Sequence, residues 1–551
     1  MKLLALLWST SRGRFLASLA ASILSGVANA GIIAAIHYGL NRRAPTSLFT
    51  ELVIALCLLA PLSRAVSQVM LVRLGHDATE RLVLMLSRRI LAAPLARLER
   101  IGAGRLLAAL TDDVSAITAG FSGILAIGLS SGVIVCCLAY LGWLSVSILM
   151  GVLALLGFAL LTAKFANSIA TKQMRVARGA RDRLFEAFRA LTYATKELKL
   201  HRGRREAFFA ELFRPAIAIF RRHDFNGNVS YIVAGMWQQL LFFSSIIILL
   251  FYFPAGATTG YSKMGFALIL LYMMSPIMVI LTMAPSLGRA AVALQKLDEL
   301  GLALSQQPEE IEAKPTVKLP EWSVIRLEQV THSYRGPNDA VSFKLGPIDL
   351  EVPRGETLFI TGGNGSGKTT LAKLIVGLYK PDSGRILLGQ EPMPENGLYS
   401  LRENFSAVFS DAYVFDRLLG IRQPDLDRKA QEYLAILQME KTVSIRQGAL
   451  STTAVSQGQR KRLALLTAYM EDRDVYVFDE WAADQDPEFK DVFYYSLLKK
   501  LSEAGKTVIV ISHDDRYFKV ADRIVKLESG KITQDIRVDH ALPIPASVQL
   551  S

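Results

Sequence analysis

Cysteine is scarce in this chain of 551 residues, which contains only three of them. Cys57, Cys136 and Cys137 all lie inside apolar stretches. Their number and spacing give neither a disulfide framework nor the paired ligands of a zinc site. We interpret them as packing residues. The sequence also has no short-period repeat and no low-complexity tract, so a solenoid or a disordered chain is not indicated.

Charged residues are absent from four long runs, residues 15–41, 119–163, 229–253 and 264–288. Each run reaches the roughly 20 residues that cross a bilayer as a helix. Residues 119–163 are long enough for two crossings with a tight turn near residues 142–145. Residues 52–71 form a further span that only Arg64 interrupts. The sequence therefore predicts six membrane-spanning helices. Buried core helices of a soluble protein are the alternative, but these are usually shorter and amphipathic.

The basic residues lie mostly between these runs. Residues 73–118 and 164–228 are rich in Arg and Lys, whereas the short connections hold only Arg42, Arg43 and Lys263. The positive-inside rule places both long basic loops, and both chain termini, in the cytoplasm. The net charge of +13 needs no nucleic acid, because topology and anionic membrane lipid account for it. The first run is too long for a cleavable signal peptide and no cleavage site follows it.

The sequence changes character after residue 304. Residues 305–321 are polar and contain three prolines, which is typical of a linker. From residue 322, short apolar runs at 323–327, 357–360, 475–478 and 508–511 alternate with helical patterns. We predict an all-α six-helix transmembrane domain (residues 1–304) fused to an α/β domain (residues 322–535). An irregular tail (residues 536–551) follows.

A phosphate-binding loop is indicated by TGGNGSGKTT at residues 361–370. An apolar run precedes it and a helical pattern, residues 371–378, follows, which is the context that separates this motif from a chance glycine-rich turn. The glycines let backbone N–H groups converge on phosphate oxygens, and the helix N-terminus adds a positive end. Lys368 would reach the β- and γ-phosphates, and Thr369 would ligate Mg²⁺. The predicted nucleotide-binding residues here are Gly362, Asn364, Gly365, Ser366, Gly367, Lys368, Thr369 and Thr370.

Two carboxylates end the apolar run at residues 475–478. Asp479 is placed to coordinate Mg²⁺, and Glu480 is placed to act as a base on the attacking water. An apolar run followed by two acidic residues is common by itself. It becomes specific downstream of a phosphate loop, and we therefore predict that the α/β domain is a P-loop ATPase domain.

The order of the motifs resembles that of ABC transporter ATPases. Between the phosphate loop and Asp479 lies the segment VSQGQ, a variant of the LSGGQ signature, and after Glu480 an apolar run ends in Ser-His. The resemblance implies that the signature binds the nucleotide of the opposite subunit, through Ser456, Gln457, Gly458 and Gln459. It also implies that His513 contacts the γ-phosphate in cis, that Asp486 is the D-loop aspartate and that Tyr334 stacks on adenine. The usual loop glutamine is replaced by Ser410, and Asp411 or a water is the candidate to stand in for it.

The resemblance continues in the membrane half. Residues 104–114 and 197–208 are similar to the two cytoplasmic loops of ABC exporters, whose membrane and ATPase domains share one chain. Residues 479–487, with 407–411 and 512–515, resemble the cyclic-peptide and siderophore exporters of pyoverdine or microcin type. This implies an ATP- and Mg²⁺-dependent homodimeric exporter of a peptide or siderophore-like compound in the bacterial inner membrane. An ATP-gated channel, a regulatory membrane ATPase and a lipid flippase remain alternatives. The six spans argue against a soluble ATPase acting on nucleic acid.

Arg64 carries the prediction of a substrate cavity. A charged residue within an apolar span costs a few kcal/mol and usually faces a cavity or a partner. Gln68 lies one turn further along, and Gln238 and Gln239 lie in the fifth span. These four residues could line a path for an anionic peptide. A structural ion pair or hydrogen bond from Arg64 to another helix is an equally open alternative.

Overall fold

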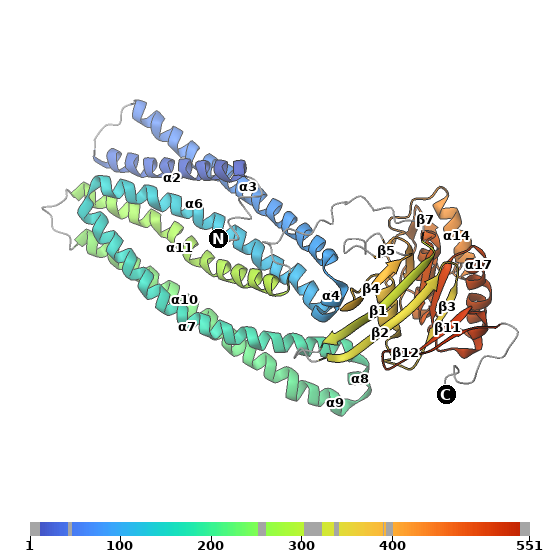
Figure 1. Cartoon of the computed structure of the whole chain (residues 1–551). Helices are drawn as coiled ribbons and strands as arrows, with labels where there is room; N and C mark the ends of the chain where they lie inside the picture. The colour runs from blue at the N-terminus through green and yellow to red at the C-terminus, as the bar shows by residue number, and fades with distance from the viewer. Residues whose placement is uncertain are drawn as a thin grey trace. The chain divides into compact units, whose positions relative to one another are not determined.

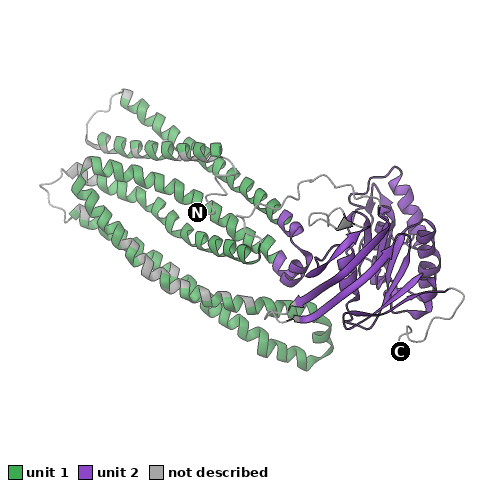
Figure 2. Ribbon diagram, in the orientation of Figure 1, with its two compact units in different colours: residues 1–87, 107–305 green, residues 88–106, 306–551 purple. Residues whose placement is uncertain are grey.

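The computed structural model describes residues 12–41, 47–251, 260–301, 322–335, 341–389, 391–392 and 401–539. The chain divides into two compact units (Figure 2). Unit 1 comprises Met1–Ser87 and Leu107–Ser305, and unit 2 comprises Arg88–Leu106 and Gln306–Ser551. The whole predicted linker and the last twelve residues of the predicted tail lie outside the described residues, so the predicted boundaries of the linker stay predictions.

Six long helices build unit 1 (Figure 1). They are α2 (Arg12–Asn41), α3 (Ser47–Ala92), α6 (Val114–Leu144), α7 (Val146–Tyr193), α10 (Arg214–Phe251) and α11 (Gly260–Glu299). Helix α6 packs along α11 and α2, and α7 packs along α10. Each predicted span lies on its own helix, and α6 turns into α7 at Ser145, within the predicted turn.

Four segments are long and apolar enough to cross a membrane: Phe49–Ala92, Ala103–Trp143, Arg202–Ile248 and Phe266–Glu299. The other two predicted spans have shorter apolar stretches among the described residues, Ile23–Ile36 in α2 and Val146–Phe158 in α7. The interpretation of the cysteines as packing residues holds for Cys137, which is buried, but is wrong for Cys57, which is exposed in this chain.

The two basic segments predicted as loops are mainly helical. The apolar helices α3 and α7 continue into them, and short elements complete each turn. These elements are α4 (Leu95–Ile101), α5 (Ala103–Ala108), α8 (Thr195–Leu200), α9 (Arg202–Ala207) and the π-helical stretches Ala109–Asp113 and Phe208–Phe213. Helix α4 belongs to unit 2, where Leu95 and Ala96 pack against the apolar core.

Two main sheets form the rest of unit 2. The antiparallel sheet has the order β2-β1-β4-β5, and the larger sheet has the order β12-β11-β3-β10-β9-β6, in which only β12 is antiparallel. The strands are β1 (Val324–Arg335), β2 (Val341–Pro353), β3 (Thr357–Thr361), β4 (Ser383–Leu388), β5 (Glu391–Pro392), β6 (Phe405–Val408), β9 (Val475–Asp479), β10 (Thr507–Ile511), β11 (Arg523–Glu528) and β12 (Lys531–Arg537). A small hairpin pairs β7 (Ile445–Arg446) with β8 (Ala449–Leu450). The α-helices are α12 (Lys368–Ile375), α14 (Leu426–Ile436), α15 (Gln457–Glu471), α16 (Pro487–Asp491) and α17 (Leu498–Glu503).

The central strands explain where the site lies. Strands β3, β9 and β10 are buried along their whole length, as expected for parallel strands covered on both faces. Ile511 of β10 pairs with Ile360 on one side and with Asp479 on the other. The carboxyl ends of three neighbouring strands therefore coincide, and the loops that follow them meet at one edge of the sheet. The predicted irregular tail starts too early, because β12 continues to Arg537 through its pairing with β11.

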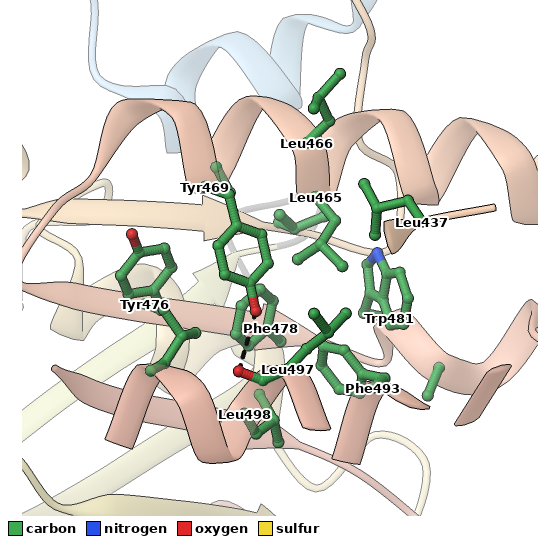
Figure 3. Packing of buried hydrophobic residues seen from close by; sticks show 14 of the residues in the cluster. Leu437, Leu465, Leu466, Tyr469, Tyr476, Phe478, Trp481, Phe493, Leu497 and Leu498 are labelled. Carbon is green, nitrogen blue, oxygen red and sulfur yellow. Dashed lines mark hydrogen bonds between the residues drawn. The ribbon is translucent and has the colours of Figure 1, made fainter. Parts of the chain in front are cut away.

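An aromatic core ties helix α15 to strand β9 (Figure 3). Trp481 is 1% exposed, contacts the Phe493 ring at 4.3 Å between centroids, and donates its indole N–H to the Lys461 carbonyl at 2.7 Å. Tyr469 donates to the Leu497 carbonyl at 3.2 Å. Burying one such large side chain contributes about 1.5–3 kcal/mol. This core holds the start of α15 in a fixed relation to the two carboxylates at the end of β9.

Candidate functional site

The loop between β3 and α12 has the backbone of a phosphate cradle. Gly362 has φ +142° and Gly367 has φ +103°, in the region that favours glycine. A Cβ on Gly362 would lie 2.1 Å from the Leu527 carbonyl oxygen, so no side chain fits there. Helix α12 begins at Lys368, three residues earlier than predicted, and so its free N–H groups lie at the loop. Asn364, Gly365 and Ser366 complete the loop, and the buried Ser366 hydroxyl has no hydrogen-bond partner in the described part of the chain.

Lys368 is held across the loop. Its ammonium donates to the carbonyls of Gly362 at 2.9 Å and Gly363 at 3.0 Å, and the side chain is 5% exposed. Burial lowers the pKa of Lys368, and the nearby carboxylates of Glu480 and Asp479 oppose that shift. The site therefore holds one buried cation, the Lys368 ammonium, beside the carboxylates of Glu480 and Asp479. A bound phosphate would bring further negative charge to this cation.

Thr369 and Asp479 form an oxygen pair suited to a hard cation. The Thr369 hydroxyl donates to Asp479 Oδ2 at 2.9 Å. Asp479 is fully buried, and its Oδ1 has no hydrogen-bond partner among the described residues. Burial raises the pKa of Asp479, while the Thr369 hydrogen bond opposes the shift. A cation at Oδ1 would satisfy that oxygen and favour the ionised carboxylate.

This oxygen pair fits Mg²⁺ only together with other ligands. Within the described ranges, no group of three or more His, Cys, Asp and Glu side chains could hold a metal ion. Mg²⁺ commonly uses one or two protein oxygens and takes the rest of its shell from phosphates and water. Thr369 and Asp479 meet that requirement beside the loop, whereas they would be too few ligands for a metal site made of protein alone.

Glu480 and His513 meet at the same edge of the sheet. His513 Nε2 lies 2.8 Å from Glu480 Oε1, in a pocket of about 270 Å³. Both side chains are about one-third exposed, at 33% and 36%. Glu480 has a left-handed backbone (φ 50°), and the Lys461 ammonium donates to its carbonyl at 2.9 Å. The carboxylate therefore has an accessible oxygen, a histidine partner and a fixed backbone, which is what a general base requires.

The signature segment caps helix α15. Ser456 is the N-cap, and a reciprocal pair of hydrogen bonds with Gln459 (3.3 and 3.1 Å) forms a capping box. The helix therefore begins at Gln457, directly after its cap. The Gly458 carbonyl accepts from Gln485 at 3.0 Å, and a Cβ on Gly458 would lie 2.7 Å from the Asp484 carbonyl. Glycine is needed there because the D-loop backbone packs directly against it.

Asp486 fixes the D-loop. Its Oδ1 accepts the Phe489 N–H at 2.8 Å as the N-cap of α16, and its Oδ2 pairs with Arg462 at 2.6 Å. The cap hydrogen bond, with Arg462, holds the pKa of Asp486 below its usual range. The sequence interpretation missed Lys461, which is 4% exposed and joins Asp484 at 2.8 Å to the Glu480 carbonyl. A lysine on the apolar face of α15 was the available signal.

The two halves of the predicted nucleotide site are separate within one chain. Residues 456–459 are hydrogen-bonded to the D-loop residues 484–485. No hydrogen bond or ion pair joins residues 456–459 to the phosphate loop in the portion of the chain that the structure describes. The signature therefore does not contribute to the phosphate cradle of its own chain.

Tyr334 lies beside the phosphate loop. Thr370 Oγ1 donates to the Tyr334 hydroxyl at 3.3 Å, and that hydroxyl donates to Tyr379 at 3.0 Å. Ser410 and Asp411 follow β6, which pairs with β9 at Val408 and Phe478. Both are exposed, and neither makes a hydrogen bond or ion pair with another described residue. The sheet places them near the end of β9 without engaging either in the site.

The four polar residues predicted to line one membrane cavity are divided. Arg64 borders a cavity of about 60 Å³ together with Ser25, Asn29, Tyr272 and Ser275. Gln238 and Gln239 border a separate cavity of about 80 Å³ that is otherwise mainly apolar. Gln68 borders neither. In this chain the four residues therefore do not border one common cavity, and the substrate path through them stays a prediction. The first cavity lies among α2, α3, α6 and α11, and the second among α7, α10 and α11.

Comparisons with known proteins follow this division of the chain. Residues 13–281 match the family model of the ABC transporter transmembrane region, and residues 345–483 match that of the ABC transporter. The chain is 34% identical to the ATP-binding protein SyrD of Pseudomonas syringae pv. syringae, over 97% of this chain and 96% of that protein. It is 27% identical to the mesentericin-Y105 transport/processing ATP-binding protein MesD of Leuconostoc mesenteroides, over 47% and 36%.

The fold as a whole also has a solved counterpart. A bacterial Atm1-family ABC exporter with ATP bound superposes with a TM-score of 0.76 at 16% identity, covering 98% of this chain and 96% of that one. At that identity the likeness concerns the fold. It extends over both units, so the arrangement of long membrane helices followed by a two-sheet ATPase is shared along the chain.

Proposed function

Because this chain belongs to the ABC transporter family, as an exporter half-transporter that couples ATP hydrolysis to transport, we propose that it is a homodimer exporting a peptide or siderophore-like compound. The observation that carries the homodimer is the separation of the phosphate loop from the signature in one chain. Two copies would supply both halves of two equivalent ATP sites. Both basic segments, and with them the ATPase domain, would face the cytoplasm of a bacterial inner membrane.

The residues at the sheet edge divide the work of hydrolysis. We assign the γ- and β-phosphates to Lys368 and to the N–H groups of residues 362–367. Mg²⁺, held by Thr369 and Asp479 with phosphate oxygens, would neutralise charge on the transferred group. Glu480 would take a proton from the attacking water, and His513 would hold the Glu480 carboxylate and reach the γ-phosphate. The Tyr334 ring would stack on adenine.

The signature of each subunit would close over the nucleotide of the other. Ser456 caps α15, and the N-terminus of that helix carries free N–H groups that suit a γ-phosphate. Three hydrogen bonds hold this helix end against the D-loop, whose partners in them are Asp484, Gln485 and Asp486. A movement of one ATPase domain would therefore carry the signature and the D-loop together, which gives a two-state element biased by ATP.

Ser456→Arg is expected to block ATP-driven pairing of the ATPase domains while ATP binding falls by less than about threefold. The added side chain would put bulk and a positive charge at the helix end that must approach the partner's nucleotide. A cysteine crosslink across the ATPase dimer, formed with ATP in a variant that also carries Glu480→Gln, measures pairing. Thr467→Arg, further along the same helix, is the matched control. Equal crosslinking with Ser456→Arg would contradict the proposed role.

The chemical nature of the cargo has to be argued from unit 1, which contains the predicted membrane spans. The match to the mesentericin transporter covers less than half of the chain. The cavity at Arg64 is bordered by uncharged side chains, of which some carry hydroxyl or amide groups and others are apolar. No acidic residue pairs with Arg64 anywhere in the described part of the chain. A guanidinium among neutral polar groups suits an anionic group on the cargo better than a structural ion pair. We therefore propose a cargo that carries a carboxylate or a similar anion.

Arg64→Gln is expected to lower export severalfold while basal ATPase activity and thermal stability stay within about 20% of wild type. The amide keeps hydrogen-bonding capacity but loses the charge that would hold an anionic cargo. Arg73→Gln, two to three turns further along α3, is the control. Aggregation, or loss of basal activity in Arg64→Gln alone, would show that Arg64 is a structural residue.

The function itself is tested by comparing metabolites inside and outside cells with and without the gene. An exporter predicts that a peptide or siderophore-like compound accumulates inside the cells that lack it. Uptake of that compound into sealed inside-out vesicles must require ATP and proceed against its gradient. A channel would only equilibrate the compound, and a flippase would move labelled phospholipid in the same vesicles.

A further inference from the structure

Three hydroxyl groups and a carboxylate form a continuous chain of hydrogen bonds in unit 2. Thr370 at the start of α12 donates to Tyr334, Tyr334 donates to Tyr379 at 3.0 Å, and Tyr379 donates to Glu99. Each hydroxyl has one proton to give, so the carboxylate, which only accepts, sets the direction of the whole chain. Glu99 lies in α4, 280 residues away from Tyr379 in the sequence.

The middle member of this chain of hydrogen bonds, Tyr379, is buried and closely packed. Tyr379 is 1% exposed, and its ring stacks on His332 at 4.8 Å between centroids. The Lys373 ammonium lies 5.2 Å from the Tyr379 ring centroid and 2.7 Å from Glu99 Oε1. Burial, followed by the hydrogen bond to Glu99, raises the pKa of Tyr379, so the phenol stays protonated and remains a donor at neutral pH. A change at Glu99 must therefore act on Tyr334 through one fixed side chain.

The two ends of this chain of hydrogen bonds lie in parts of the protein with different functions. Tyr334 is only partly buried, and its hydroxyl accepts a hydrogen bond from Thr370 at the start of α12, next to the phosphate loop. Helix α4 lies between two breaks, at Ala93-Pro94 and at Gly102 (φ +81°), in the segment that joins α3 to α6. Both of those helices belong mainly to unit 1, which contains the predicted membrane spans. The hydrogen bonds thus begin at the nucleotide site and end in the segment that continues into two membrane helices.

We propose that Glu99 and Tyr379 are positioning residues that set the orientation of the Tyr334 ring, so that helix α4 senses whether a nucleotide base is bound. This proposal rests on the proposed stacking of Tyr334 on adenine. Hydrogen bonds arranged in a chain strengthen one another, so losing Glu99 or the Tyr379 hydroxyl weakens the constraint on Tyr334. The phosphate contacts at Lys368 are made by other groups and stay unchanged.

The test uses purified full-length protein and two ligands, ATP and inorganic tripolyphosphate, which lacks the base. Glu99→Gln and Tyr379→Phe are expected to weaken ATP binding about three- to tenfold, the size of one hydrogen bond. Tripolyphosphate binding should change less than twofold. The double variant should be no weaker than the worse single variant, because the two residues act in series. Glu432→Gln and Tyr495→Phe, at exposed positions of the ATPase domain, are the matched controls.

The possible results separate this proposal from the one on which it rests. Tyr334→Ala should lose most of the preference for ATP over tripolyphosphate. If it does not, the adenine assignment fails. If Tyr334→Ala behaves as expected while Glu99→Gln and Tyr379→Phe bind ATP normally, the base site stands and the positioning role is overturned. Equal weakening of both ligands in Glu99→Gln and Tyr379→Phe would also overturn it, since that indicates a general disturbance of the domain.

Discussion

Glu480→Gln is expected to bind ATP with near-normal affinity and to hydrolyse it about 10²–10⁴-fold more slowly, the usual effect of losing a positioned general base. The amide keeps the size of the side chain and its contact with His513, which lies 2.8 Å away. It cannot accept a proton from water at neutral pH. The closed ATPase dimer should therefore accumulate with ATP, and ATP turnover together with the ATP-dependent crosslink measures both effects.

A matched substitution decides whether this effect is specific. Glu503→Gln changes the same functional group at an exposed position, where the carboxylate faces Lys499 at 3.8 Å. It should retain the wild-type rate. His513→Ala should also slow turnover, and the double variant should be far from additive because the two side chains act on one proton transfer. Wild-type turnover in Glu480→Gln would refute the assignment of the base.

The parts of the site that lie close together in sequence could be predicted well. Residues 361–370 carry their own glycines and cation, and the strand before them and the helix after them were found to within three residues. Asp479 and Glu480 were predicted because a buried strand leads directly to them. The parallel register of β3, β10 and β9 then brings His513 to the same edge. Local pattern and sheet topology together were sufficient there.

Contacts between distant segments could not be predicted. Nothing in the sequence around Glu99 or Tyr379 indicates a partner, because a glutamate is ordinary on an exposed helix and a tyrosine is ordinary shortly after a buried one. The polar residues of the membrane helices show the opposite failure. Arg64 and Gln238 looked alike as polar residues in apolar spans, but helix packing places them beside different cavities. Periodicity shows which residues are unusual and does not show which helices face each other.

Lys368→Ala is expected to weaken ATP binding by roughly 10²–10⁴-fold, because a hydrogen bond to a charged group contributes about 1.5–3 kcal/mol and two phosphates would each lose one. The loss also has an internal cost. The Lys368 ammonium now satisfies the carbonyls of Gly362 and Gly363 and lies 3.9 Å from Glu480 Oε1. Removing it leaves the two acidic side chains without their nearest cation. Both sites of the proposed homodimer would carry the change, so ATPase activity should disappear altogether.

The measurement is the rise in unfolding temperature that ATP and Mg²⁺ produce, since a ligand that binds only the folded protein stabilises it in proportion to its affinity. Lys368→Ala should show no such rise at millimolar ATP, whereas Lys499→Ala, on an exposed surface, should match wild type. Lys368→Arg separates charge from shape. The Lys368 side chain is 5% exposed, and its surroundings fit a compact ammonium. The variant with the larger, planar guanidinium of arginine should therefore also bind ATP poorly. A normal ATP-induced shift in Lys368→Ala would show that residues 361–370 are not the phosphate site.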